Sequence, residues 1–198
     1  AAANAGHVAE LGGGGQVSAT IFTERMAELA ESLTEGHEVT FNALNLDPYL
    51  WDLHIGRERI VQRAREAGAP ICGVTVSAGI PETDAAVALI EELRDLGIWL
   101  NAFKPGTADQ VQEVLEIADR IDGDLWLHLE GGRAGGHHSW VELEDLLFTT
   151  YAKIRERDNV VLCVGGGVGT PERAAELLGG TWALRHNAYR MPVDAVLL

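Results

Sequence analysis

Basic residues are scarce in this chain of 198 residues, in which 15 Lys and Arg stand against 30 Asp and Glu and give a formal net charge of −15. Such a chain has no basic footprint for nucleic acid, so we expect no nucleic-acid partner. Cysteine is also rare, and Cys72 and Cys163 both lie in apolar runs. We therefore expect buried thiols, no disulfide, and a reducing, cytoplasmic compartment.

Long apolar runs are missing as well. No run approaches the ~20 residues that a membrane helix requires, so we expect no membrane association. Residues 1–6 lack the basic and apolar regions of a signal peptide. The chain starts without Met in a helix-like turn and stops in a strand-like run at 194–198. We interpret it as a fragment of a larger polypeptide.

A regular alternation of strand-like and helical patterns fills the chain. Hydrophobic residues make up 46% and the mean hydropathy is +0.02, which suits one globular domain over residues 1–198. The apolar, strand-like runs begin near Val39, Ile71, Ile98, Leu125, Val160 and Asp194, with 6–11 as a weaker candidate. Each interval has the length of a βα repeat, roughly 30 residues.

The strand at 71–76 is apolar at nearly every position, which is typical of parallel strands that are covered on both faces. A βα repeat of such strands fits either a doubly wound open sheet or a (β/α)8 barrel. Glycines and polar residues follow most of the strands, and this favours the barrel. We predict an α/β fold, a (β/α)8 TIM barrel that is incomplete because strand 1 and the region after strand 8 are missing.

Helix-end signals support this division. Residues 18–33 show one apolar stripe and predict an amphipathic helix. Pro81 opens a predicted helix that ends near Leu96, with Gly97 after it. Thr107 and Gln110 form a capping box for the next helix.

Two glycine clusters follow apolar strands. The first is Glu130-Gly-Gly-Arg-Ala-Gly-Gly-His-His-Ser139, where glycines admit a close ligand and paired imidazoles offer proton transfer or metal ligation. The second is Gly165-Gly-Gly-Val-Gly169, before the helix start at Pro171. Successive backbone N–H groups at a helix N-terminus stabilise an anion, so this turn predicts a phosphate cradle.

These motifs, with Phe103-Lys-Pro-Gly106 before them, resemble the enoyl reductase domain of type I fatty acid synthases of the bacterial and fungal kind. The resemblance spans nearly the whole chain, from residue 6 to residue 198. It extends more distantly to nitronate monooxygenases and flavin-dependent bacterial enoyl reductases, which share a shorter Gly-Gly-His signature.

The resemblance implies an FMN-binding fold in which NADPH or NADH reduces FMN, and FMN reduces a trans-2-enoyl thioester. It implies His137 as the proton donor, supported by His138. The implied partners are an acyl carrier domain and other synthase domains in a homo-oligomeric complex. The implied cofactor-binding residues are Asn42, Ser77, Lys104, His128, Gly131, Gly132, Gly135, Gly136, Gly165, Gly166 and Gly167.

Several alternatives stay open. Lys104 could neutralise flavin N1 or a phosphate, or be a solvated strand-end lysine, and Arg133 could bind the cofactor's phosphate or pair with a carboxylate. A nitronate monooxygenase-like flavoprotein would use oxygen. A zinc or iron site could be built from His128, Glu130, His137 and His138. A non-catalytic scaffold segment is a further alternative.

Overall fold

The computed structural model describes residues 1–135 and 138–198. These residues fall into two compact units, 1–102 and 103–198. The prediction of one domain stays a prediction. Among the described helices, none combines the length and the apolar character needed to cross a membrane. Both cysteines are buried, as predicted.

The first unit contains three paired strands. β2 pairs in parallel with β1 on one side and with β3 on the other. All seven residues of β3 are buried, in agreement with their continuous apolar pattern. The elements of this unit are η1 (Ala3–Ala5), β1 (Glu10–Gly12), η2 (Gly13–Gly15), α1 (Ala19–Ser32), β2 (Val39–Leu44), α2 (Pro48–His54), α3 (Ile60–Glu66), β3 (Ile71–Ser77) and α4 (Thr83–Asp95). A further strand, β4 (Leu100–Phe103), crosses the boundary between the units.

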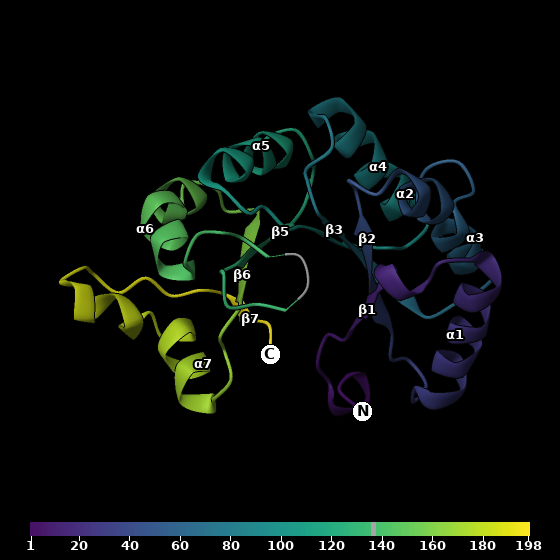
Figure 1. Cartoon of the computed structure of the whole chain (residues 1–198), viewed down its shortest axis with the longest axis horizontal. Helices are drawn as coiled ribbons and strands as arrows, with labels where there is room; N and C mark the ends of the chain where they lie inside the picture. Colours follow the sequence, from purple (N-terminus) through teal and green to yellow (C-terminus); the bar gives the residue numbers. More distant parts are fainter. Residues whose placement is uncertain (136–137) are drawn as a thin grey trace. The chain divides into compact units, whose positions relative to one another are not determined.

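Helix α1 buries part of the apolar stripe that the sequence predicts. Phe22 and Met26 are its buried residues, and the Phe22 ring meets Phe41 of β2 edge-on with the ring centroids 5.5 Å apart. The helix begins after Ser18, whose side chain accepts a hydrogen bond from the N–H of Ile21 at 3.3 Å. Figure 1 shows the helices of this unit along the outer side of its strands.

The second unit repeats this arrangement. β6 pairs in parallel with β5 and with β7, and α5, α6 and α7 lie along the outer side of these strands (Figure 1). The elements are α5 (Ala108–Ala118), β5 (Leu125–Glu130), α6 (Leu143–Ile154), β6 (Val160–Gly165), α7 (Pro171–Leu178), η3 (Thr181–His186) and β7 (Ala195–Val196).

Most of the predicted helix ends are confirmed, but α4 begins at Thr83, two residues after the predicted Pro81. Gly97 follows α4 with φ +75°, and Pro171 is the first residue of α7. The Thr107 side chain accepts a hydrogen bond from the N–H of Gln110 at 3.2 Å. The reciprocal half of the capping box is shifted by one residue, because the Gln110 side chain accepts from the N–H of Gly106 at 2.8 Å.

The prediction of a (β/α)8 TIM barrel is wrong. The described strands form a seven-stranded sheet in the order β1-β2-β3-β4-β5-β6-β7, so each end strand has one neighbour. β1 and β7 are short, at three and two residues, and do not pair with each other among the described residues. The βα repeat predicts which strands are neighbours along the chain, but it does not predict closure. The fold is an open α/β sheet, and its order lacks the switch point of a doubly wound sheet.

Candidate functional site

Two glycine-rich loops begin side by side in the second unit. Glu130 at the end of β5 is in register with Gly165 at the end of β6. The N–H of Gly131 donates to the carbonyl of Gly165 at 3.1 Å, which ties the two loops together. Gly166 has φ +88°, and a Cβ there would lie 2.9 Å from the carbonyl oxygen of Gly131. Both the backbone conformation and the close approach therefore require glycine.

The loop after β6 presents a row of backbone donors. Within the described parts of the chain, the N–H groups of Gly166, Gly167, Val168 and Gly169 donate no hydrogen bond. Gly166 and Gly167 have successive positive φ angles of +88° and +81°, and successive N–H groups in such turns form anion-binding concavities. Helix α7 starts directly afterwards, so its N-terminus adds to the positive potential. This geometry suits a phosphate.

His128 lies next to Gly165, where this loop starts. Its side chain comes from β5, in register with Cys163 of β6, and the residue is only 5% exposed. The Nε2 atom has no hydrogen-bond partner in the described chain and would lie 3.0 Å from a Cβ placed on Gly165. Burial, followed by the nearby charge of Lys104, lowers the pKa of His128 from 6.5 to about 4. The imidazole is therefore neutral at pH 7, with an unused polar atom beside Gly165.

Lys104 forms an ion pair with Glu130, and the two side chains are 14% and 8% exposed. The solvated-lysine alternative for Lys104 is therefore excluded. A buried pair of this kind keeps both charges in a fixed place at the ends of β4 and β5. The sequence indicates Glu130 only as a metal ligand, because the pairing depends on two strands being neighbours.

Ser139, which follows the paired histidines in the sequence, contacts the residues directly before α5. The Ser139 side chain donates to the carbonyl of Gly106 at 2.5 Å and accepts from the N–H of Val141 at 2.9 Å. Ser139 is buried, and its anchoring role has no sequence signal beyond its place after the histidines. The ring centroid of His138 lies 6.5 Å from that of Trp140.

Gly136 and His137, a predicted cofactor contact and the predicted proton donor, lie outside the described residues. Gly135 is exposed, and no atom of the residues that the structure describes lies within 4 Å of the position that a Cβ would take there, so packing against those residues does not explain this glycine. The second unit thus brings together Lys104, His128, Gly131, Gly132 and the loop at 165–167 from the predicted set.

Asn42 and Ser77 meet in the first unit. The Ser77 hydroxyl donates to the side-chain oxygen of Asn42 at 2.5 Å, and the Asn42 amide donates to Glu10 at 2.8 Å. Thr75 also donates to Glu10, at 2.6 Å. The sequence carries no signal for Glu10 or Thr75, which join the cluster through the register of β1, β2 and β3. Ala78, which follows Ser77 at the end of β3, has φ +54°, a strained value for alanine.

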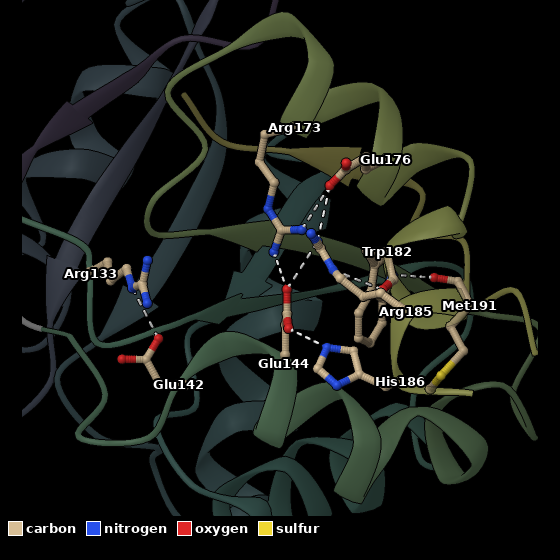
Figure 2. A network of polar contacts seen from close by, with 9 residues as sticks. All are labelled: Arg133, Glu142, Glu144, Arg173, Glu176, Trp182, Arg185, His186 and Met191. Carbon is tan, nitrogen blue, oxygen red and sulfur yellow. Dashed lines mark hydrogen bonds and ion pairs between the residues drawn. The ribbon is translucent and has the colours of Figure 1, made fainter. Parts of the chain in front are cut away.

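A second polar network joins α6, α7 and η3, as Figure 2 shows. Glu144 accepts hydrogen bonds from Arg173 at 2.7 Å and Arg185 at 3.4 Å, and lies 2.9 Å from Nε2 of His186. Burial alone would raise the pKa of Glu144, but the hydrogen bonds from Arg173 and His186 and the arginine charges lower it. The network lines a pocket of about 660 Å³ that also reaches Gly166 and Gly167.

Arg133 pairs with a carboxylate in this structure. Its Nε atom lies 3.2 Å from Glu142, and the side chains are 74% and 58% exposed. Both residues line the same pocket, next to Gly167. The carboxylate-pairing alternative is thus observed, and the phosphate alternative stays open.

The metal alternative receives no support from residues 1–135 and 138–198, where no group of three or more His, Cys, Asp or Glu side chains is placed to hold an ion. His137, one of its four proposed ligands, lies outside those residues.

Comparison with known proteins connects this chain to fatty acid synthesis enzymes. A family model described as fatty acid synthase subunit beta/Fas1-like, helical, matches residues 124–198, which contain both glycine-rich loops. The fatty acid synthase beta subunit pigK of Monascus ruber is 33% identical over 196 residues, covering 98% of this chain and 9% of that protein.

Two further relatives agree. Fatty acid synthase subunit beta of Schizosaccharomyces pombe is 34% identical over 200 residues, covering 100% of this chain and 9% of the relative. Fatty acid synthase 2 of Mycosarcoma maydis is 35% identical over 189 residues, covering 95% and 5%. The chain therefore spans less than a tenth of the length of these curated relatives. By this similarity, the chain is a homologue of one segment of the fungal fatty acid synthase beta subunits.

Proposed function

We propose that this chain contributes the flavin-binding site of an FMN-dependent enoyl-[acyl carrier protein] reductase within a fatty acid synthase. NADPH is the proposed reductant, with NADH as the second candidate. The proposed partners are an acyl carrier domain that delivers the thioester and the other synthase domains. The similarity to synthase beta subunits supports the pathway, and the resemblance of the Gly-Gly-His-His loop supports the reductase step.

One observation carries the proposal: a buried, neutral imidazole, whose Nε2 atom has no partner in the described chain, lies beside Gly165, and the next four residues offer backbone N–H groups that have no acceptor there either. FMN offers a phosphate dianion and a planar ring edged with hydrogen-bonding atoms, and the residues present fit both. The loop at 166–169 would take the phosphate, since its N–H groups need no added charge to bind an anion. Nε2 of His128 would make a hydrogen bond to the bound ligand.

Other residues of the second unit would orient the bound ligand and shield it from water. Lys104 and Glu130 hold opposite charges in a nearly water-free place, where electrostatic effects are stronger than in water. When bound, FMN would supply a hydride for the β-carbon of the enoyl thioester. The α-carbon then requires a proton, and His137 with His138 are the proposed donors. Asn42 and Ser77 are proposed cofactor contacts from the first unit on the strength of the resemblance.

The test is an anaerobic titration of the purified chain with FMN, followed in the visible absorbance spectrum. We expect a perturbed flavin spectrum that bleaches with NADPH and returns when an enoyl thioester is added. His138→Ala and His137→Ala should slow the return and leave the bleaching unchanged, because the proton is needed only in the second half-reaction. A folded chain that leaves the FMN spectrum unaltered would refute the proposal, and oxygen uptake with a nitroalkane would favour the oxygen-using flavoprotein.

A further inference from the structure

Arg133 occupies an unusual position at the rim of the glycine-rich loop after β6. Its stem runs along Gly167, with Cβ and Cδ both 3.4 Å from the place of a Gly167 Cβ. Its backbone lies in a tight turn, where the N–H of Ala134 donates to the carbonyl of Gly131 at 3.2 Å. Since Gly131 is itself bonded to Gly165, the origin of the Arg133 side chain is fixed relative to the loop at 165–169.

The guanidinium of Arg133 is held only weakly. Among the described residues, its one carboxylate contact is the 3.2 Å approach of Nε to Glu142, between two mostly exposed side chains. Exposed ion pairs of this kind contribute little to the free energy of folding, so replacing Glu142 with a more strongly bound anion costs little. The other two arginines of the same pocket differ: Arg173 and Arg185 each contact both Glu144 and Glu176. Of the three guanidiniums that line the pocket, Arg133 has the fewest of these carboxylate contacts (Figure 2).

The loop beside Arg133 has independent signs of a ligand. The N–H groups at 166–169 lack acceptors among the described residues, and the buried Nε2 of His128 is aimed at Gly165, where the loop starts. A phosphate monoester bound to those N–H groups would carry two negative charges close to the Arg133 stem. Guanidinium binds phosphate through paired, charge-assisted hydrogen bonds, which are stronger than one exposed contact to a carboxylate.

We infer that Arg133 is a phosphate ligand, which Glu142 holds beside the glycine-rich loop until a phosphate binds and replaces Glu142 as the partner of the guanidinium. This inference deepens the proposed function and rests on it in one respect, namely that the phosphate belongs to FMN. Arg133 and Glu142 therefore set how strongly the site prefers FMN over the same flavin without a phosphate. The ring-binding part of the site does not depend on them.

The experiment compares the affinity of the chain for FMN and for riboflavin, measured by quenching of flavin fluorescence. Arg133→Gln keeps most of the stem over Gly167 and removes the charge. It should weaken FMN binding by about tenfold, the effect of one lost hydrogen bond to a charged group, and leave riboflavin binding unchanged. Glu142→Gln removes the competitor, so it should strengthen FMN binding and leave riboflavin binding unchanged.

Arg185→Gln is the matched control, because it removes an arginine of the same pocket that pairs with Glu144 and Glu176 instead of Glu142. Equal loss of FMN affinity in Arg185→Gln and Arg133→Gln would overturn the inference, since the effect would then be one of general charge. Equal loss of FMN and riboflavin in Arg133→Gln would overturn it too, as would no loss of either. In all these cases FMN still binds the unaltered chain, and the proposed function survives.

A second probe separates the two proposals when neither flavin binds, an outcome that would refute the proposed function. Inorganic phosphate is titrated into the isotope-labelled chain, and the amide resonances of Gly166, Gly167 and Gly169 are followed by NMR. Shifts that occur in the unaltered chain and weaken in Arg133→Gln would support the role of Arg133 as a phosphate ligand without a flavin. An absence of shifts in that case, or equal shifts in both proteins, would overturn it.

Discussion

His128 should make the stability of this chain depend on pH in a defined window. Its pKa is about 4 in the folded protein and near 6.5 when the side chain is solvated. Between these pH values the unfolded chain binds a proton that the folded chain does not, so the free energy of unfolding falls as the pH is lowered. The stability is complete above pH 6.5 and is lost progressively toward pH 4.

The size of this loss follows from the same two values. At about 1.36 kcal/mol for each pKa unit, a difference of about 2.5 units corresponds to about 3 kcal/mol. The side chain is 5% exposed, so solvent screening reduces this figure little. Such a loss is a large part of the stability of a typical domain, about 5–15 kcal/mol.

Urea unfolding at a series of pH values from 7 to 4 measures the effect. The informative quantity is the difference in pH dependence between the unaltered chain and His128→Gln, because all other titrating groups cancel. The variant should lose the part of the slope that lies between pH 6.5 and 4, whatever its stability at pH 7. His7→Gln controls for the loss of one histidine at an exposed position.

Direct titration of the imidazole by NMR completes the test. A His128 resonance that titrates near pH 6.5 in the folded chain would refute the reasoning, since the side chain would then be solvated instead of buried. Identical pH dependence of the unaltered chain and His128→Gln would refute it equally.

Three further substitutions test the packing around the site by urea unfolding at pH 7. Gly166→Ala should lower the free energy of unfolding by about 2 kcal/mol or more, because a Cβ there meets a backbone oxygen at 2.9 Å in addition to the positive φ. Gly167→Ala should lower it by about 1 kcal/mol for its positive φ alone, and equal losses would contradict the described packing. Lys104→Met should lower the free energy of unfolding by about 3–5 kcal/mol, because it leaves a buried carboxylate unpaired. The control Arg25→Met removes an exposed pair and should lower it by less than about 1 kcal/mol, and a small loss for both variants would mean that Lys104 is solvated. Ala78→Gly should stabilise the chain by about 0.5 kcal/mol by relieving a φ of +54°, and a loss of stability would show that the methyl group contributes more than the strain removes.

The sequence predicts local structure well where one segment contains the whole signal. The side chain of Thr107 caps α5 as predicted, and Pro171 opens α7, because each end depends on residues within one turn. The strand positions follow from continuous apolar runs, which need no knowledge of the rest of the chain. The glycine-rich loop at 165–167 is predictable for the same reason.

Features that depend on neighbouring strands are not predictable in this way. The pairing of Lys104 with Glu130 requires adjacent strand ends, and the contact of Thr75 with Glu10 joins residues 65 positions apart. The prediction of sheet closure is wrong for a related reason, since a repeat says nothing about whether its first and last members meet. The positive φ of Ala78 has no sequence signal, because glycine is the usual residue at such an angle.

The network around Glu144 has a consequence for how the second unit opens. Helix α7 has eight residues and buries only Leu177, so its own packing holds it weakly. Arg173 of α7 and Arg185 of η3 both form ion pairs with Glu144 of α6, so one carboxylate links the three elements. We expect their amides to exchange with deuterium as one cooperative group. The exchange rate of the slowest turn of α7 would then depend on a carboxylate of another helix, α6, as well as on the packing of α7 itself.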